Sequence, residues 1–335
     1  MHDSFQGTES DDLRRHPAAE AWRRLQPHST VPTRVDLIGD KRSLERKIEI
    51  FRLTLESSES VGLSVVVAKR LSTESCLAEY RSYEILAHRS VSCLKCYGYV
   101  AEGEDECWLF LEDAGGETFN STSDRHRLSA YDWIARMHVE TARGREHHPR
   151  DRGVDYYGQV CSTSRKHLLS ALHRGAFEAE DTHTLNALVA ALRELEAQWG
   201  HLRLACDRVP QSLTHNALLD RNFRVREHRG EVDFVAFDWE RSGWGSPALD
   251  IGRLVGWAPE EGVHEYWRRV RSAWSGVSAD DVERLAVTGS LFKLIQSVAW
   301  DASYIERDWY PRPLTTLEIY RKRLEQDLAT LAAWK

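Results

Sequence analysis

The chain has 335 residues, with 45 Lys and Arg against 52 Asp and Glu, and a formal net charge of −7. This length is long for one compact core and favours two lobes. The acidic balance and the scattered basic residues argue against a nucleic-acid-binding surface. No apolar run approaches the roughly 20 residues needed to span a bilayer, and the first residues lack a basic segment followed by an apolar one. We therefore expect a cytoplasmic globular protein without nucleic-acid or membrane partners.

The six cysteines are too few for a disulfide scaffold in a chain of this length. Cys93 and Cys96 have the spacing of metal ligands, but a zinc site needs a second pair, and none with suitable spacing lies nearby. We expect free structural thiols.

The first 112 residues predict an antiparallel sheet with one helix. Residues 1–30 are polar and include a short amphipathic piece, residues 18–25, expected to be an arm packed on a lobe. Alternating apolar residues then predict strands, and apolar residues at helical spacing predict one helix. The expected strands are 34–38, 47–55, 63–69, 95–100 and 107–111, and the helix is 75–87.

Beyond residue 112 the apolar spacing is mostly helical. A single predicted hairpin, 223–226 with 232–238, sits among the helices. The helices are expected at 128–141, 161–172, 182–199, 264–274, 279–306 and 315–334. The expected organisation is therefore an arm (1–30), a nucleotide-binding N-lobe (31–112) and a helical C-lobe (113–335) that carries a catalytic loop and an acceptor site.

The most informative segment is Leu213–Asn222 together with Phe237-Asp-Trp-Glu240. In kinase-type loops an aspartate accepts the proton of the substrate hydroxyl, an asparagine five residues later binds a metal, and an aspartate on the next hairpin binds metal and phosphates. Asn222 and Asp238 correspond to the second and third groups. The position of the first group holds Ala217.

His215–Asn222, Phe237–Glu240 and Gly245-Ser-Pro-Ala-Leu-Asp250 resemble the aminoglycoside phosphotransferase and choline kinase family. Its loop runs His-Gly-Asp, four residues, then Asn, followed by an Ile-Asp-Trp/Phe-Glu strand and a Gly-x-Pro-x-x-Asp segment. The resemblance covers nearly the whole chain. It implies an α+β, bilobal protein-kinase-like fold, with a small antiparallel N-lobe containing one helix and a larger, mostly helical C-lobe. It also implies ATP as phosphate donor, Mg²⁺, and a small hydroxylated acceptor.

Lys69 follows the apolar residues Val65-Val-Val-Ala68, which aims its ammonium group toward the expected cleft. There it can bind the α- and β-phosphates. A surface lysine at a strand end is the simpler explanation, but Glu79 on the next helix is available as an orienting ion-pair partner. Arg70 should face the opposite side of the strand.

Asn222 and Asp238 supply an amide oxygen and a carboxylate, which suit Mg²⁺ because this ion keeps several waters. Each is also common as a turn or cap residue, and their joint occurrence at this spacing favours metal ligands. Glu240 can contact metal-bound water. His215 is expected to hold the loop through hydrogen bonds, and Asp250 to support the loop backbone.

Two further segments are candidates for nucleotide contacts. Between the first two strands, Gly39–Ser43 offers one glycine, and Ser43 and backbone amides can donate hydrogen bonds to phosphate oxygens. A plain charged turn explains this segment equally well. The resemblance alone implies that backbone groups of Glu112 and Ala114, in a hinge after the last strand of the N-lobe, read an adenine edge.

Ala217 cannot accept a proton, and loss of a positioned base typically costs about 10²–10⁴ in rate. Asp220 lies three residues beyond the family position and is not assigned the role. Either the alanine is a laboratory substitution in an intact site, which the other motif residues favour, or the chain is a natural noncatalytic pseudokinase that acts as a nucleotide sensor or scaffold. A hydrolase using His215 and Asp220 is disfavoured, because no Gly-x-Ser-x-Gly turn accompanies them.

The acceptor site is expected on the predicted helix 279–306. Trp300, Asp301 and Glu306 place an aromatic ring and two carboxylates near where the family binds its acceptor. Such a wall suits a cationic molecule, although packing of a helix against its neighbours explains the aromatic residues as well. The sequence does not distinguish among an aminoglycoside, another hydroxylated antibiotic, a choline-like alcohol and a sugar.

Overall fold

The computed structural model describes residues 13, 15–42, 47–55, 64–144, 147–175, 177–228, 231–307 and 314–334. The chain forms two compact units, and the first contains three separate stretches of sequence. The first unit comprises residues 1–120, 147–149 and 219–242, and the second comprises 121–146, 150–218 and 243–335.

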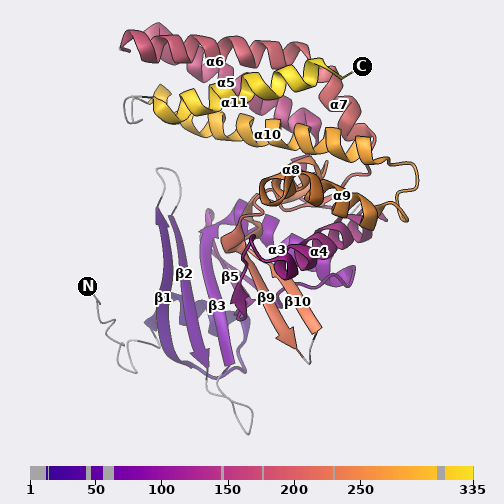
Figure 1. The fold of residues 1–335 in the computed structure, drawn as a ribbon. Helices are drawn as coiled ribbons and strands as arrows, with labels where there is room; N and C mark the ends of the chain where they lie inside the picture. Colours follow the sequence, from indigo (N-terminus) through magenta and orange to yellow (C-terminus); the bar gives the residue numbers. More distant parts are fainter. Residues whose placement is uncertain are drawn as a thin grey trace. The chain divides into compact units, whose positions relative to one another are not determined.

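The first unit is built around a five-stranded antiparallel sheet, in which the strands lie in the order β1-β2-β3-β5-β4 (Figure 1). All five strands were predicted from alternating apolar residues. Their bounds are β1 Pro32–Arg42, β2 Lys47–Leu55, β3 Ser64–Ser72, β4 Cys96–Glu102 and β5 Glu106–Glu112. β3 lies at the centre, paired with β2 on one side and β5 on the other.

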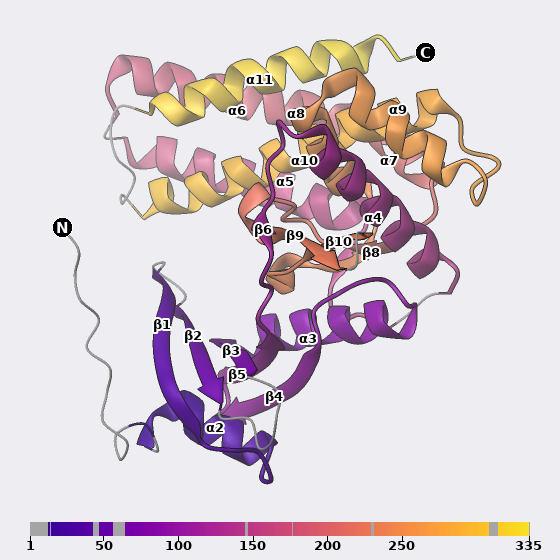
Figure 2. The ribbon, with the colours of Figure 1, turned by 60° about the horizontal axis from the view of Figure 1, so that its bottom comes forward.

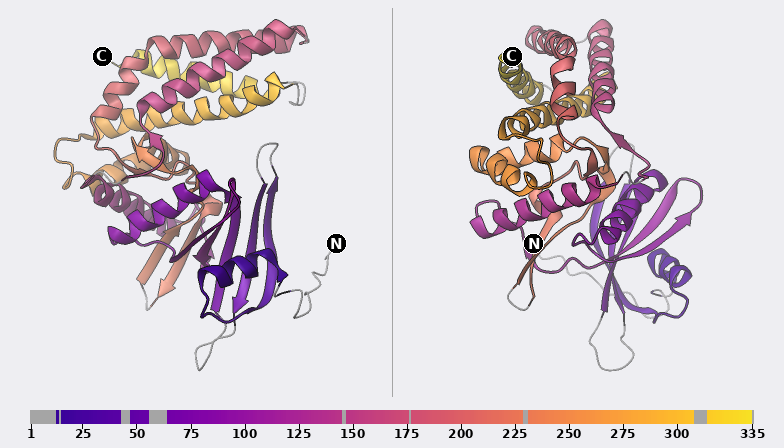
Figure 3. Two further views of the ribbon diagram at one scale, coloured as in Figure 1. Left: turned by 180° about the vertical axis from the view of Figure 1, so that it is seen from behind. Right: turned by 90° about the vertical axis from the view of Figure 1, so that its right-hand side faces the viewer.

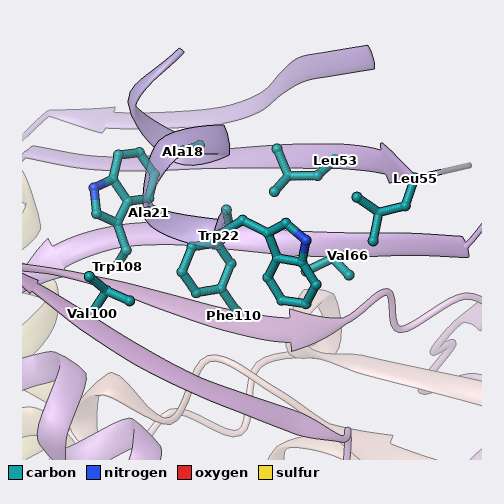
Figure 4. Close-up of a cluster of buried hydrophobic side chains, with 10 residues drawn as sticks. Ala18, Ala21, Trp22, Leu53, Leu55, Val66, Val100, Trp108 and Phe110 are labelled. Atoms are coloured by element: carbon teal, nitrogen blue, oxygen red, sulfur yellow. The ribbon is translucent and has the colours of Figure 1, made fainter. Parts of the chain in front are cut away.

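One face of this sheet is covered by the N-terminal helix α2 (Pro17–Leu25), seen crossing the strands in Figure 3. Its small residues Ala18 and Ala21 allow close approach, and Trp22 enters a core formed by Leu53, Leu55, Val66, Ala68, Val100, Trp108 and Phe110 (Figure 4). The Trp22 ring lies 5.3 Å from that of Phe110. The predicted amphipathic piece is therefore an integral part of this unit.

Helix α3 (Thr73–His88) follows β3 directly and contacts β3, β4 and β5 (Figure 2). The Ser72 side chain caps its first turn by accepting a hydrogen bond from Ser75 N. A second small sheet in the order β10-β9-β6 completes the first unit. It consists of β6 Glu117–Thr118, β9 Phe223–His228 and β10 Glu231–Ala236, with short 3₁₀ turns at Asp220–Asn222 (η1) and Trp239–Arg241 (η2).

The second unit is mainly helical, and α5, α6, α10 and α11 pack side by side within it (Figure 1). Its helices are α4 Asp124–Ala142, α5 Val154–Arg174, α6 Ala179–Ala197, α7 Trp199–Asp207, α8 Ala248–Trp257, α9 Pro259–Val270, α10 Ala279–Glu306 and α11 Thr315–Ala332. A small sheet in the order β7-β11-β8 lies among them, with bounds Asp151–Arg152, Gly243–Gly245 and Ser212–Thr214.

Helices α7 and α8 were not predicted. The expected helix 182–199 instead ends at Ala197, and α7 begins two residues later. Helix α8 crosses α10 at Gly252 and Gly289, where a Cβ atom on Gly289 would lie 1.8 Å from the Ala248 carbonyl oxygen. This close crossing places α8, which carries Asp250, against the middle of α10.

We expect Trp22→Ala to lower the free energy of unfolding by about 3–5 kcal/mol, because it removes a large buried ring from the sheet core. Trp22 is only 3% exposed and also donates a hydrogen bond from Nε1 to Ser29 Oγ at 3.0 Å. Denaturant unfolding measures the change. The matched control is Trp300→Ala, at a tryptophan that is 48% exposed, where a loss of less than about 1 kcal/mol is expected. Equal losses in the two variants would contradict the structural role of α2.

Candidate active site

The alternation of β3 determines which side chains face the site. Ala68 and Val66 enter the core beneath α2, whereas Val67 and Lys69 line a pocket on the opposite face. Arg70 points away from Lys69, as predicted, and is paired with Glu49, Glu102 and Glu106.

Lys69 lies at the centre of a buried group of charges. Its Nζ is 2.7 Å from Glu79 Oε2 on α3 and 2.5 Å from Asp238 Oδ1, which follows β10. Glu240 Oε2 lies 4.0 Å away. The Lys69 side chain is 5% exposed and that of Glu79 is fully buried. We call these four residues the Lys69 cluster; they come from β3, α3 and the segment after β10, all within the first unit.

The Lys69 cluster changes the proton affinities of its members. Burial raises the pKa of Glu79 from 4.5 to about 7; the charge of Lys69 opposes this shift, and the charge of Asp238 adds to it. Burial alone would lower the pKa of Lys69, but the surrounding carboxylates outweigh it and raise that pKa above its ordinary value. The lysine therefore remains a cation, and Glu79 holds a proton to a higher pH than an exposed glutamate does.

Asn222 and Asp238 lie at the two ends of the β9–β10 hairpin. Phe237 N donates a hydrogen bond to Asn222 O at 3.0 Å, which ties the start of β9 to the end of β10. Asp238 has φ +68° and ψ +55°, a left-handed conformation that non-glycine residues seldom adopt. Such backbone strain is concentrated at functional sites. Asn222, Asp238 and Lys69 line the same pocket.

This pocket, of about 400 Å³, belongs to the first unit. Its apolar walls are formed by Ile38, Ile50, Val67, Leu94, Leu111 and Phe237. Its polar lining contains the Lys69 side chain, the segment Glu112–Gly116 after β5, and the arginines Arg52, Arg221 and Arg224. Apolar walls with a few placed polar groups are typical of a small-molecule or nucleotide site.

The predicted catalytic loop belongs to the second unit up to Leu218, and its backbone is held by Asp250. The Asp250 carboxylate accepts hydrogen bonds from His215 N at 2.7 Å and from Asn216 N at 2.8 Å. His138 Nε2 lies 3.4 Å from the same carboxylate, and the other ring nitrogen of His138 contacts Tyr266 OH at 2.9 Å. All these groups are buried.

A scan against protein-family models matches residues 52–286 to the phosphotransferase enzyme family. The chain belongs to this family. No curated protein matches the sequence significantly.

Several solved structures share the fold. The GDP complex of a point mutant of aminoglycoside 2′-phosphotransferase IIIa has a TM-score of 0.59 at 11% identity, over 94% of this chain and 97% of that chain. Spectinomycin phosphotransferase APH(9)-Ia, in complex with ADP and spectinomycin, scores 0.57 at 9% identity, with coverages of 98% and 99%. A choline/ethanolamine kinase family protein from Mesorhizobium loti scores 0.54 at 15% identity, with coverages of 97% and 93%. The likeness confirms the predicted α+β protein-kinase-like fold.

Within this phosphotransferase family the loop of the present chain departs from the His-Gly-Asp pattern at two positions. Asn216 replaces the glycine and adopts φ +62°, which asparagine tolerates better than most residues. Its side chain accepts a hydrogen bond from Tyr157 OH at 3.0 Å and donates one to Thr214 Oγ1 at 2.8 Å. Ala217 N donates to His215 Nδ1 at 3.2 Å. His215 is thus engaged in holding the loop.

The chemistry of the Lys69 cluster fits a divalent cation. Three carboxylates surround one ammonium group, and Glu79 Oε1 is buried without a hydrogen-bond partner among the described residues. The Asn222 amide and the Asp238 carboxylate are oxygen donors of the kind that Mg²⁺ prefers. Within the described ranges no group of three or more His, Cys, Asp or Glu side chains forms a dedicated metal cage, and a magnesium site shared with phosphates does not need one.

The remaining predicted site residues are placed as follows. Ser43 lies outside the described residues. Trp300 on α10 is exposed and lies against Tyr304, with ring centroids 5.2 Å apart. Asp301, also on α10, contributes to raising the pKa of Tyr320, for which burial is the larger cause. Glu306 Oε2 lies 3.5 Å from His167 Nε2 on α5. The helix thus presents Trp300 to the surface, while Glu306 has a partner within the second unit.

The sequence interpretation missed Arg52 and Arg226, which contact the segment Glu112–Gly116 after β5, here called the hinge segment. It also missed Tyr157, which donates a hydrogen bond to Asn216. Arg52 Nε pairs with Asp113 Oδ2 at 2.8 Å, and Arg226 contacts three successive residues from Glu112 onward. Arginine and tyrosine at such positions are unremarkable in a sequence. The one available signal was Asn216, which stands where the family motif has glycine.

Among the described residues, the helices include none with the length and hydropathy needed to span a bilayer.

We expect the stability of the protein to fall as pH rises between about 4.5 and 7, relative to a Glu79→Gln variant. The folded protein holds a proton on Glu79 up to a pKa of about 7, whereas the unfolded chain releases it near 4.5. Folding therefore binds a proton in this window, so stability is greatest below it and is lost through it. Denaturant unfolding at a series of pH values measures the difference. A pH-independent difference between the two proteins would contradict the raised pKa.

Proposed function

We propose that the protein transfers the γ-phosphoryl group of ATP to a hydroxyl group of a small molecule, and that Ala217 impairs this transfer in the present form. The observation that carries the proposal is the Lys69 cluster. A buried lysine paired with a helix glutamate, beside an aspartate that follows a hairpin, is the arrangement used to hold triphosphate and metal in kinase-type sites.

In this proposal Lys69 binds the α- and β-phosphates, and Glu79 holds the ammonium group in position. Asn222 and Asp238 are the proposed ligands of Mg²⁺, and Glu240 contacts it through water. A bound Mg²⁺ would neutralise negative charge that develops on the phosphates during transfer. The Lys69–Asp238 ion pair then has to loosen, because the same carboxylate oxygen faces the ammonium group at 2.5 Å.

His215 and Asp250 have a positioning role in this proposal. Asp250 fixes the backbone of residues 215 and 216, and His215 accepts a hydrogen bond from residue 217 through its ring. The loop geometry therefore depends on Asp250 and His215, and not on the side chain at 217.

The proposed acceptor is a hydroxylated small molecule, with Trp300, Asp301 and Glu306 as candidate contacts. Among the similar structures, one was solved with kanamycin and another with spectinomycin. The exposed Trp300 and the carboxylates on the same helix suit a cationic acceptor. An ATP donor also implies that the protein acts in the cytoplasm.

Ala217 favours a second candidate function, that of a noncatalytic nucleotide-binding protein acting as sensor or scaffold. A methyl group cannot accept the hydroxyl proton, whereas all four residues of the Lys69 cluster are present. Nucleotide binding without transfer is the expected behaviour of such a protein.

We expect Ala217→Asp to raise the rate of phosphoryl transfer by about 10²–10⁴, because it restores a positioned base. The measurement couples ADP release to mass-spectrometric detection of the phosphorylated acceptor. The acceptor panel contains kanamycin, spectinomycin, choline and simple sugars. Ala217→Asn is the matched control, since it has nearly the same shape but cannot take a proton, and it should stay near the starting rate.

Nucleotide binding, measured by thermal shift with Mg²⁺ and ATP, separates the two candidate functions. Binding by every form except Lys69→Met, with transfer in Ala217→Asp alone, supports the enzyme. Binding without transfer in Ala217→Asp, across the whole panel, supports the noncatalytic protein. Absence of binding in both the present form and Ala217→Asp contradicts both.

A further inference from the structure

Two buried cysteines of the first unit face each other between α3 and β5. Cys76 lies near the start of α3, and Cys107 lies near the start of β5. The Sγ atom of Cys76 donates a hydrogen bond to that of Cys107 at 2.7 Å, and both residues are 0% exposed. Because a disulfide bond has a sulfur–sulfur distance of about 2.05 Å, the two atoms lie within about 1 Å of bonding distance.

The backbone around each of these cysteines is held in place. Cys107 is paired with β3 on one side and with β4 on the other. The start of α3 is tied to the turn between β4 and β5, because Thr73 N donates to Asp105 O at 2.9 Å and Thr73 Oγ1 donates to Glu104 O at 3.2 Å. The sheet and the helix therefore keep the two sulfur atoms together.

The other cysteines are arranged differently, although all six are free thiols in this structure. Those outside the pair are Cys93, Cys96, Cys161 and Cys206. Among the described residues, no two of these four form a sulfur–sulfur hydrogen bond. Cys96 on β4 is opposite Leu111 of β5, four residues from Cys107, which is about 13 Å along a strand. The contact between Cys76 and Cys107 is thus specific to this pair.

Cys107 is the member of the pair that loses its proton first. The hydrogen bond from Cys76 lowers the pKa of Cys107; burial opposes this shift, and a hydrogen bond with the backbone of Val100 adds to it. The same contact with Cys107, together with burial, raises the pKa of Cys76. Since the thiolate is the reactive form of cysteine, Cys107 is the nucleophile and Cys76 is the thiol that follows it.

We propose that Cys76 and Cys107 form a reversible disulfide bond when the protein is exposed to hydrogen peroxide, and that this bond cross-links α3 to β5. The inference does not depend on nucleotide binding or on phosphoryl transfer, so it stands apart from the proposed function.

The reaction takes place in two steps. The Sγ atom of Cys107, after losing its proton, attacks one oxygen of the peroxide; a sulfur–oxygen bond forms, the oxygen–oxygen bond breaks, and the hydroxide that leaves takes up that proton as water. The Sγ atom of Cys76 then attacks the sulfenic acid on Cys107; the disulfide bond forms, the sulfur–oxygen bond breaks, and hydroxide leaves with the proton of Cys76 as a second water. Two thiols lose two electrons, and the peroxide gains them.

The bond would lie on the face of the sheet that carries the Lys69 cluster. Cys107 is opposite Leu71 of β3, which faces the same side as Lys69 because it is two residues farther along the strand. Cys76 precedes Glu79 by three residues, or about one helical turn. The cross-link would therefore fix the turn of α3 from which Glu79 reaches Lys69.

The test uses the full chain with Cys93→Ser and Cys96→Ser, because these two thiols are partly exposed and would react with the oxidant first. The variant keeps four of the six cysteines. Hydrogen peroxide is added under native conditions for several hours, since access to a buried pair needs local opening. Thiols counted after denaturation should fall from four to two, and dithiothreitol should restore them. Digestion with trypsin and a glutamate-specific protease, followed by mass spectrometry, should show Cys76 linked to Cys107.

Cys76→Ala in the same background is the matched control, and it should keep its three thiols. Cys161 is an internal control, because it is equally buried but has no sulfur partner among the described residues. The bond joins residues 31 positions apart and restricts the unfolded chain. Oxidation should therefore raise the midpoint of thermal unfolding by about 5 °C in the background variant and leave that of Cys76→Ala unchanged.

Four outcomes overturn the inference. They are retention of all four thiols, loss of thiols without a link, a link between any other two cysteines, and a link between Cys76 and Cys107 that forms only when the oxidant is added in denaturant. If a variant fails to fold, the peptide map of the oxidised unaltered protein decides the question, because it identifies the linked residues without any substitution.

Discussion

The buried ammonium group of Lys69 is the constraint on which the site depends. A charge removed from water is costly unless it is paired, and Lys69 is 5% exposed. Its partners come from α3 and from the segment after β10. The sheet therefore places the ammonium group, and the helix and the segment after the hairpin place carboxylates within reach of it. Burial raises the pKa of Glu79, and the charge of the neighbouring Asp238 adds to this shift.

The β9–β10 hairpin links this cluster to the hinge segment. The end of β10 leads into Asp238, and Asn222 immediately precedes β9. Farther along β9, Arg226 binds the carbonyls of residues 113 and 114. One two-stranded element therefore positions Asn222 and Asp238, which line the pocket with Lys69, and also holds two backbone carbonyls of the hinge segment. A change in the register of β9 would alter both, because its residues alternate between the two sides of the strand.

The sequence was sufficient for those features that follow from periodicity or from spacing. Alternating apolar residues predicted the five strands and the side of β3 that Lys69 faces. The spacing of Asn222 and Asp238 predicted metal ligands, which stays a prediction, and the structure places both residues in the pocket that Lys69 lines. Arg226 could not be found in this way, because side-chain contacts to backbone carbonyls depend on tertiary placement and require no partner of a particular type. Helix α7, which begins at Trp199 directly after Gln198, was also missed, since the predicted helix ended at residue 199 and no further helix was expected before the loop.

The backbone of the loop around Ala217 is held by contacts that need no polar side chain at 217. The buried carboxylate of Asp250 accepts hydrogen bonds from the backbone N–H groups of His215 and Asn216. The side chain at 217 takes no part in these two hydrogen bonds. The strained conformation of Asn216 is supported by Tyr157 and Thr214. Since the geometry of the loop is determined by these neighbours, replacing an aspartate with alanine at 217 removes a proton acceptor without removing the frame that would position it. The architecture of this loop is thus carried by the neighbours of residue 217, so a substitution at 217 leaves the contacts of Asp250 and Tyr157 in place.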